Sequence, residues 1–114
     1  MSDEQTAARP MRMYRVDKFN VPDASRVEHM KGVHTTHAKL AMIDGFIQDF
    51  LIEKRAGPDS YTLVTIVEWE SEEAFHNAIV TMREWQAGQG INREERWKRL
   101  GITPELGDYH TVMD

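Results

Sequence analysis

The stretch YTLVTIVEWESEEAF, residues 61–75, decides the fold, because it carries a strand and the start of a helix with no loop between them. Residues 61–70 are rich in β-branched and aromatic side chains, which favour strands. Ser71 is a residue type that caps helices, and Glu72 and Glu73 fall in the first turn, where negative charge is stabilising. The stretch therefore predicts a strand that leads directly into a capped helix.

The chain before this stretch predicts two strands around a long helix. Strands are expected at 11–21 and 46–54, and the second forms a hairpin with 61–70 across the Gly-Pro loop RAGPDS. The helix is expected at 24–43, with Asp23 as its N-cap and Gly45 as its stop. Its buried stripe is expected to hold Val27, Met30, Val33, Leu40 and Ala41.

The chain after this stretch completes the order β-α-β-β-α-(α)-β. The helix that Ser71 caps has the stripe Phe75, Ala78, Ile79, Met82 and Trp85 and ends at AGQG, residues 87–90. NREERWKRLG, residues 92–101, predicts a short helix with Asn92 and Glu95 as a capping box, and a last strand is expected at 107–113. This order is typical of the α+β ferredoxin-like fold, with four antiparallel strands in one sheet and the two long helices on one face.

The composition excludes several classes of protein. The 114 residues fit one domain, expected at 11–114 after a polar, disordered tail at 1–10. A net charge of −5 and the acids within REERWKR argue against nucleic acid as a partner. The absence of cysteine excludes disulfides and thiol catalysis. No apolar run reaches the roughly 18 residues of a membrane span, so a cytoplasmic protein with no membrane partner is expected.

Both faces of the predicted sheet carry apolar side chains. In the strand 61–70, Tyr61, Leu63, Val67 and Trp69 oppose Val64 and Ile66, and in the strand 46–54, Phe46, Phe50 and Ile52 oppose Ile47 and Leu51. One chain has helices for one face only, and a monomer would expose an apolar patch of roughly several hundred Å² on the other. Two chains are therefore expected to pack sheet to sheet, as a homodimer with a barrel-like core.

The stretch GVHTTHAKL, residues 32–40, places two histidines three residues apart in the predicted helix. At about 100° per residue, His34 and His37 fall on the expected buried face, with His29 at its edge and Gly32 on the outer face. The pair can be core histidines, a general base, since histidine ordinarily titrates near neutral pH, or half of a metal site. A third metal ligand would have to come from Glu68, Asp49 or His110.

Two segments resemble the antibiotic biosynthesis monooxygenase family of the dimeric α/β-barrel superfamily. They are GFIQDFLIEK, residues 45–54, and VTIVEWESEEAF, residues 64–75. The second contains a Trp-x-Ser-x-x-Ala-Phe junction made by Trp69, Ser71, Ala74 and Phe75. The resemblance covers roughly residues 12–113 and implies a dimeric α/β barrel with a pocket between each sheet and its own helices.

The resemblance also implies an oxygenase that uses no flavin, haem or metal. A base removes a proton from an electron-rich phenol, anthrone or quinol, and the resulting anion passes an electron to O₂. The protein then supplies the base, donors for the oxyanion and a dry pocket. His37 or His34 is the expected base. The expected pocket residues are Tyr14, Trp69, Phe75, Met82 and Trp85, with Tyr14 or Tyr109 as an oxyanion donor.

Two other functions stay open on the same scaffold: an isomerase of a small lactone or phenolic acid, and a binding or stress-response protein without turnover. A haem-degrading branch also shares the fold. It has an Asn in the first strand, a Trp within the second helix and a haem-ligating His near the end of that helix. The corresponding positions here are Val16 or Asp17, Ala78 and about Gly88, so the chain departs from that branch.

Overall fold

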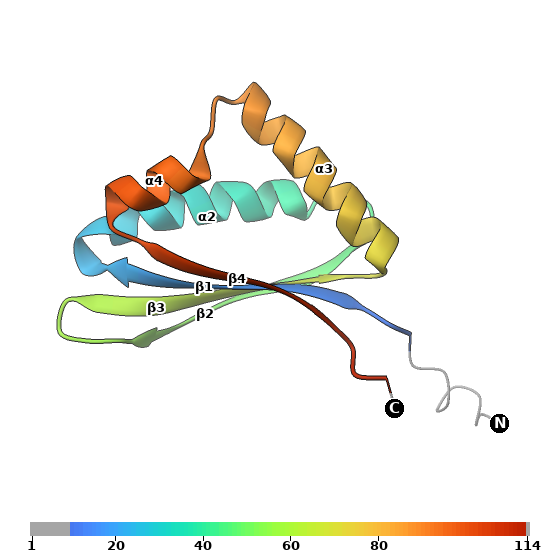
Figure 1. Cartoon of the computed structure of the whole chain (residues 1–114), viewed down its shortest axis with the longest axis horizontal. Coiled ribbons are helices and arrows are strands. Elements are labelled where there is room, and N and C mark those ends of the chain that lie inside the picture. Colours follow the sequence, from blue (N-terminus) through green and yellow to red (C-terminus); the bar gives the residue numbers. More distant parts are fainter. Residues whose placement is uncertain (1–9, 114) are drawn as a thin grey trace.

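The computed structural model describes residues 10–113, which form one antiparallel four-stranded sheet with helices on one face (Figure 1). The elements are β1 (Met13–Pro22), the 3-10 turn η1 (Asp23–Ser25), α2 (Arg26–Leu40), β2 (Phe46–Arg55), β3 (Ser60–Trp69), α3 (Glu72–Gly88), α4 (Arg93–Leu100) and β4 (Thr103–His110). The strand order is β2-β3-β1-β4. The predicted α+β ferredoxin-like fold is therefore confirmed.

The arrangement of helices and strands does not test two of the predictions, the tail at 1–10 and the cytoplasmic location. The predicted tail at 1–10 lies outside the described residues except for Pro10. No helix within residues 10–113 is long and apolar enough to cross a membrane. The cytoplasmic location stays a prediction.

The junction at 61–75 folds as its sequence predicts. Side chains along β3 alternate between buried and half-buried, as expected for a strand with one face under helices. The Ser71 hydroxyl accepts a hydrogen bond from the Ala74 N–H at 3.1 Å, and α3 begins at Glu72. Asn92 caps α4 in the same way, accepting from the Glu95 N–H at 3.1 Å. Both caps satisfy helix N–H groups that otherwise lack partners.

The core consists of two apolar clusters on the helix side of the sheet. One joins α2 and α4 to the sheet, and the other joins α3 to it. The first contains Phe19, Val21, Val33, Tyr61, Leu63, Leu100 and Ile102, and the second contains Met13, Val67, Trp69, Phe75 and Ala78. Figure 1 shows why the clusters are separate: α3 rises away from the sheet while α2 lies along it.

The opposite face of the sheet is open and partly apolar. The register places Val16, Val64 and Ile66 side by side at its centre, each half-buried. Phe50 and Ile52 of β2 extend this surface and are 49% and 55% exposed. The prediction that the β3 strand is apolar on both faces is confirmed.

Helix α2 turns a different side to the sheet from the predicted stripe. Val27 is 83% exposed, whereas His29, predicted at the edge, is only 4% exposed. The buried side runs through His29, Val33 and His37, and His34 points outward. The predicted phase was wrong because the few apolar residues of α2 define its rotation weakly. Packing decides it instead, with the His29 ring 5.1 Å from the ring of Phe19.

A β-bulge changes the predicted faces of β2. Phe46 pairs with Trp69, but the next paired residue, Gln48, faces Glu68, so Ile47 is the extra residue. Phe46 therefore shares the helix side with Leu51, and only Phe50 and Ile52 remain together on the open face as predicted.

The predicted bounds of the last strand were also wrong. The last strand is Thr103–His110 rather than 107–113, because Gly101 and Ile102 turn the chain directly onto the edge of β1, where Pro104 lies opposite Phe19. Proline is tolerated there because β4 is an edge strand.

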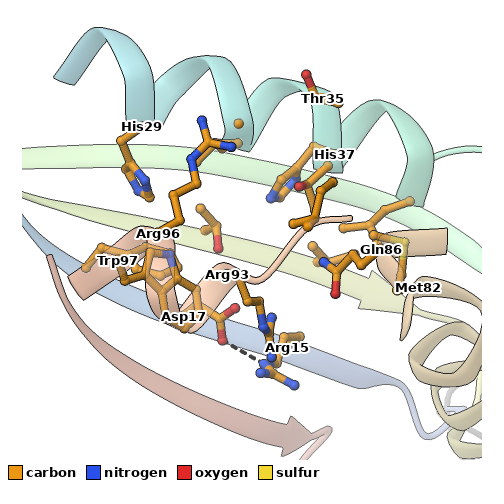
Figure 2. A pocket seen from close by; sticks show the side chains of 18 of the residues that line it. Arg15, Asp17, His29, Thr35, His37, Met82, Gln86, Arg93, Arg96 and Trp97 are labelled. Carbon is orange, nitrogen blue, oxygen red and sulfur yellow. Dashed lines mark hydrogen bonds and ion pairs between the residues drawn. The ribbon is translucent and has the colours of Figure 1, made fainter. Parts of the chain in front are cut away.

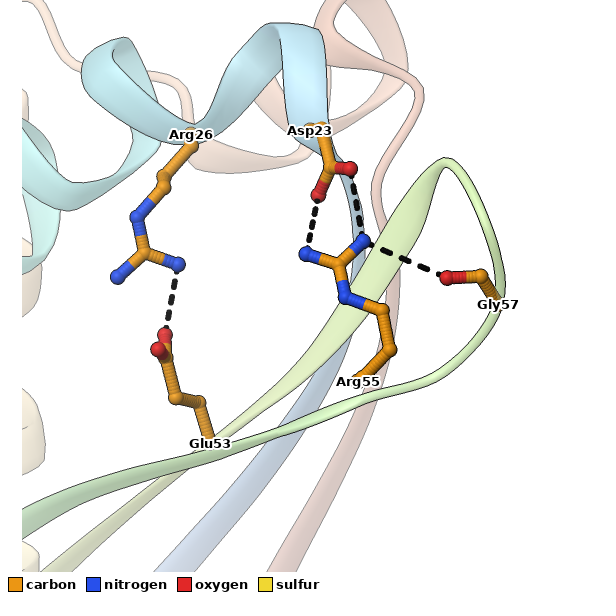
Figure 3. A network of polar contacts seen from close by, with 5 residues as sticks. All are labelled: Asp23, Arg26, Glu53, Arg55 and Gly57. Atoms are coloured by element: carbon orange, nitrogen blue, oxygen red, sulfur yellow. Dashed lines mark hydrogen bonds and ion pairs between the residues drawn. The ribbon is translucent and has the colours of Figure 1, made fainter.

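The predicted first helix, at 24–43, is shorter in the structure. It is α2 at Arg26–Leu40, preceded by η1. Asp23 makes no side-chain cap. Its carboxylate accepts two hydrogen bonds from Arg55, at 2.7 and 3.0 Å, and so ties the β2–β3 hairpin to η1 (Figure 3).

Candidate active site

A cavity of about 780 Å³ lies between the helices and the sheet. Its floor is the helix side of β1 and β3, α2 forms its roof, and α3 and α4 form its walls (Figure 2). Its apolar lining consists of Phe19, Val33, Leu40, Val67, Trp69, Phe75, Ala78, Ile79, Met82, Ile91 and Trp97. A cavity of this size accommodates a small aromatic molecule of two or three rings.

His37 lines the cavity from α2 and pairs with Asp49 of β2, which is not itself part of the lining. The Nδ1 of His37 lies 2.8 Å from the Oδ2 of Asp49, and the two side chains are 12% and 32% exposed. An ionised carboxylate can only accept a hydrogen bond, so Nδ1 donates and Nε2 carries the lone pair. Asp49 thereby holds the imidazole in the tautomer whose remaining nitrogen can take up a proton.

The β-bulge in β2 makes this pair possible. Side chains alternate along a strand, so an unbulged β2 with Phe46 on the helix side would turn Asp49 to the open face. The extra residue, Ile47, restores Asp49 to the helix side, where it lies opposite Val67 of β3. The local irregularity of β2 therefore positions the carboxylate under His37.

The floor of the cavity carries a second carboxylate, held by arginine. The Nε of Arg15 donates to Asp17 at 2.6 Å, and another nitrogen of Arg15 lies 3.3 Å from Asp108. Burial raises the pKa of Asp17 above its ordinary value, although the hydrogen bond and charge of Arg15 and the charge of Arg93 act in the opposite direction. Thr65 is buried beside it, opposite Asp17 in the β1–β3 register.

Helix α4 presents two half-buried arginines to the cavity. Arg96 donates to the Glu28 carbonyl at 2.9 Å and lies against Gly32, where a Cβ would come within 2.9 Å of the guanidinium carbon. The guanidinium of Arg93 lies 5.2 Å from the ring centre of Trp97. Gly32 was predicted on the outer face. It lies instead at the roof of the cavity, where the absence of a side chain admits Arg96.

His29 lies on the same side of α2 as His37, two helical turns away, but in an apolar setting (Figure 2). Its Nε2 is buried and has no hydrogen-bond partner within residues 10–113. Burial, with a smaller contribution from the charge of Arg96, lowers the pKa of His29 to about 4. His29 is therefore a neutral core histidine at pH 7.

The residues predicted for the site occupy three different places. His37, Trp69, Phe75 and Met82 line the cavity. His34 is exposed on the outer side of α2, and Trp85 is half-buried outside the cavity lining. Tyr14 and Tyr109 lie opposite each other in the β1–β4 register, on the open face of the sheet, where the Tyr14 hydroxyl is 3.5 Å from the Glu68 carboxylate.

The third possibility for the histidine pair, a metal ion shared by His34 and His37, finds no support in this arrangement, because the two side chains face different spaces. Of the three possible further ligands, Asp49 is the one that reaches His37. Across residues 10–113, no three or more histidine, aspartate or glutamate side chains gather as a metal site would require.

Sequence reasoning did not find the arginines of α4 or the partner role of Asp49. Arg93 and Arg96 are three residues apart, which places them on one side of a helix, so their shared direction was readable. The sequence did not show that these two arginines would lie close to α2. Asp49 carried no usable signal, because the bulge that orients it leaves no mark such as a glycine in GFIQDFLIEK.

Solved structures with the same fold include several oxygenases. A variant of SnoaB, a cofactor-independent oxygenase from Streptomyces nogalater, superposes with a TM-score of 0.65 at 23% identity over 90% of this chain and 94% of that one. The chain has the fold of the antibiotic biosynthesis monooxygenases. The resemblance inferred from GFIQDFLIEK and VTIVEWESEEAF is confirmed at the level of the fold.

Two further structures show how widely this fold is used. MhuD, a haem degrader from Mycobacterium tuberculosis with two haems bound in its active site, has a TM-score of 0.60 at 23% identity over 90% of this chain and 97% of that one. A dimeric ferredoxin-like protein from an uncultured marine organism has a TM-score of 0.68 at 9% identity, over 91% and 98% of the two chains. The sequence matches no family model and no curated relative.

The cavity residues do not fit the haem ligation of the haem-degrading branch. The histidine of α3 is His76, whose side chain is 63% exposed on the outside of the helix. Of the two histidines that line the cavity, His37 belongs to α2 rather than to the helix that carries the ligand in that branch, and the Nε2 of His29 is buried among core side chains. The departure inferred from the sequence at Ala78 and Gly88 therefore extends to the cavity itself.

Proposed function

We propose that the cavity binds a small aromatic molecule of the phenol, anthrone or quinol type and that the protein oxidises it with O₂ without a bound cofactor. The observation that carries this proposal is that His37, which lines a partly apolar cavity, is paired with Asp49. The fold shared with oxygenases supports it. Because His34 lies outside the cavity, His37 is the proposed base.

In the proposed reaction, Nε2 of His37 takes a proton from the substrate while Asp49 stabilises the imidazolium that forms. The substrate anion gives one electron to O₂, and the resulting radical pair combines into a hydroperoxide. Loss of water from the hydroperoxide of a methylene substrate leaves a ketone, so that CH₂ and O₂ become C=O and H₂O. The proton on His37 leaves with this water, which returns the imidazole to its neutral form.

The side chains around His37 suit the other tasks of this chemistry. Trp69, Phe75 and Met82 supply apolar surface that holds an aromatic ring and excludes water. The Thr65 hydroxyl on the floor and the Gln86 amide on α3 are donors within the cavity lining. We assign to these two side chains the stabilisation of the developing oxyanion, in place of the tyrosines on the open face.

The His37–Asp49 pair also favours a second candidate function, an isomerase that moves a proton within a lactone or phenolic acid. Such a reaction needs the same base and cavity and no oxidant. Dependence of turnover on O₂ separates the two functions.

Oxygen uptake by the purified, chelator-treated protein, measured against a panel of anthrones and hydroquinones, tests the proposal. Replacing His37→Ala should lower kcat by about 10²-fold or more, the usual contribution of a general base. His34→Ala is the matched control, because His34 lies on the same helix, is exposed and does not line the cavity. Equal uptake by wild type and both variants would contradict the role of His37.

We further propose that two chains form a homodimer through the open faces of their sheets. The exposed Phe50 and Ile52 beside Val16, Val64 and Ile66 form an apolar surface of the kind that proteins bury in interfaces. Light scattering after size exclusion should give twice the chain mass for wild type. Phe50→Glu, which places a charge on the β2 part of this surface, should give the mass of one chain, and a dimer unaffected by it would contradict this interface.

A further inference from the structure

The charge of the cavity is opposite to the charge of the whole protein. The chain carries a net charge of −5. The cavity lining, in contrast, contains more cationic than anionic side chains. The cations are Arg15, Lys31, Arg83, Arg93, Arg96 and Arg99, and the acids are Asp17, Glu28 and Asp108. A concave site with an excess of one sign attracts ligands of the other sign.

Four of these cations, Lys31, Arg83, Arg93 and Arg96, form no ion pair among residues 10–113, and of these Arg93 and Arg96 are half-buried whereas Lys31 and Arg83 are exposed. Arg15 is bound to Asp17, and Arg99 is bound to Glu28 at 2.5 Å. Among residues 10–113, no carboxylate oxygen lies within 4.0 Å of a guanidinium nitrogen of Arg93 or Arg96.

Arg93 and Arg96 are partly removed from water although neither forms an ion pair among residues 10–113. Both side chains are half-buried, and a cation removed from water without a counterion is destabilising. Arg96 is satisfied only in part, by the Glu28 carbonyl at 2.9 Å. Arg93 has the Trp97 ring as its neighbour, and Asp17, whose pKa the charge of Arg93 helps to lower, is already bound to Arg15. An anionic ligand between them would supply the missing negative charge.

The distance between these arginines and the proposed base sets the size of such a ligand. The guanidinium of Arg96 rests on Gly32, five residues before His37 on α2. At 1.5 Å per residue, the two positions are about 7.5 Å apart along the helix. Figure 2 shows Arg93 and Arg96 on the α4 side and His37 further along α2, with the cavity between them. Two fused aromatic rings span a separation of this order.

We propose that the substrate is an aromatic acid whose carboxylate is bound by Arg93 and Arg96, with its oxidisable ring atom at His37. The nature of the reaction rests on the proposed function, but the binding of an aromatic anion does not. Guanidinium groups form two-point, charge-assisted hydrogen bonds to carboxylates, and Trp97 beside Arg93 provides a flat apolar surface for the adjoining ring. Substrates of this class would bind in one orientation, with the acid at α4.

Binding of a matched pair of unreactive probes tests this inference. Calorimetry of the intact protein would compare 2-naphthoate with 2-naphthamide, which has the same shape without the charge. Wild type should bind the naphthoate about ten-fold or more tightly, the usual effect of charge-assisted hydrogen bonds. Arg93→Gln with Arg96→Gln should remove this preference.

Two further variants separate loss of binding from loss of folding. Arg55→Gln removes an arginine whose partner is Asp23, outside the cavity, and should keep the full preference. Arg93→Gln alone leaves the Arg96 bond to α2 intact and should lower the preference while the thermal unfolding temperature stays close to that of wild type.

The outcomes distinguish this inference from the proposed function. Equal affinity for the two probes in wild type, no binding of naphthoate, or a preference that survives in folded Arg93→Gln/Arg96→Gln protein would overturn the anion site. None of these measurements involves turnover, so the role of His37 is decided separately by oxygen uptake. His37→Ala should keep the preference for naphthoate over naphthamide, and a loss of the preference there would overturn the separation of the two subsites.

Discussion

The arginines of this protein occupy two kinds of surroundings. At the end of the molecule where β2 and β3 form their hairpin, Arg55 binds Asp23 through two hydrogen bonds, at 2.7 and 3.0 Å, and Arg26 binds Glu53 at 2.7 Å (Figure 3). The bond from Arg55 holds the pKa of Asp23 below its ordinary value. Each of these exposed cations therefore has its own carboxylate.

In the cavity, Arg93 and Arg96 form no such ion pair among residues 10–113. Arg93 and Arg96 are less exposed than Arg26 and Arg55, so an unneutralised charge is less favourable there than at the surface. Exposed pairs such as those at the hairpin contribute little to stability, because water already solvates both charges. The proposed anion site rests on this difference between Arg93 and Arg96 and the paired arginines of the hairpin.

The largest effect is expected from removing the charge of Asp49, the partner of His37. Asp49→Asn keeps the shape but removes the ionised carboxylate that sets the imidazole tautomer and stabilises the imidazolium. We expect kcat to fall about 10²-fold with KM and naphthoate affinity unchanged, as measured by oxygen uptake and calorimetry. A rise in KM with kcat preserved would mean that Asp49 contributes to binding and that the two ends of the cavity are not separate.

An effect of intermediate size is expected from acidification, which protonates His29 and so adds a positive charge near Arg96. His29 has a pKa of about 4 in the folded protein, below the ordinary 6.5 of the unfolded chain, so the folded protein takes up its proton less readily. The stabilisation from neutral His29 is complete above about pH 6.5 and is lost as the pH falls toward 4.

Denaturant unfolding at pH 8 and pH 5 measures this loss. Linkage between the two pKa values gives about 2 kcal/mol less stability at pH 5 from His29 alone. His29→Phe, which keeps an aromatic ring against Phe19, should lessen the difference between the two pH values by that amount. An unchanged difference in His29→Phe would show that other groups cause the acid sensitivity.

The smallest effect is expected at Gly32, where α2 admits Arg96. Gly32→Ala should gain up to about 1 kcal/mol from helix propensity, offset by the displacement of the Arg96 guanidinium, whose carbon would lie 2.9 Å from the new Cβ. The net change in unfolding free energy should stay within about 1 kcal/mol, while the preference for naphthoate over naphthamide falls. Gly88→Ala is the control, since a Cβ there meets nothing within 4 Å, and an equal loss of preference in it would contradict a local role of Gly32.

The fold was predictable because its signals are local and strong. The alternation in YTLVTIVEWE, the cap at Ser71 and the stripe from Phe75 to Met82 depend on neighbouring residues, and the structure confirms each. The phase of α2 was not predictable, because its sequence is only weakly amphipathic. The helix is rotated relative to the prediction, so His29 and not His34 lies on the buried side.

The site was predictable only in its parts. His37, Trp69, Phe75 and Met82 were expected around a cavity between sheet and helices, and they line it. Tyr14 was misplaced because, in a strand with apolar residues on both faces, composition does not show which face the helices cover. The β1–β3 register places Tyr14 beside Glu68 on the open face.

The sequence by itself determined the order of the elements, the helix caps and the apolar residues of β3, because strand alternation and capping act over a few neighbouring residues. Only the tertiary structure brought Asp49 to His37 and Arg96 to Gly32. The two contacts have different structural causes. The first depends on one extra residue in β2, and the second on the packing of α4 against α2. Contacts of this kind depend on how whole elements are placed, and no local pattern of residues specifies that placement.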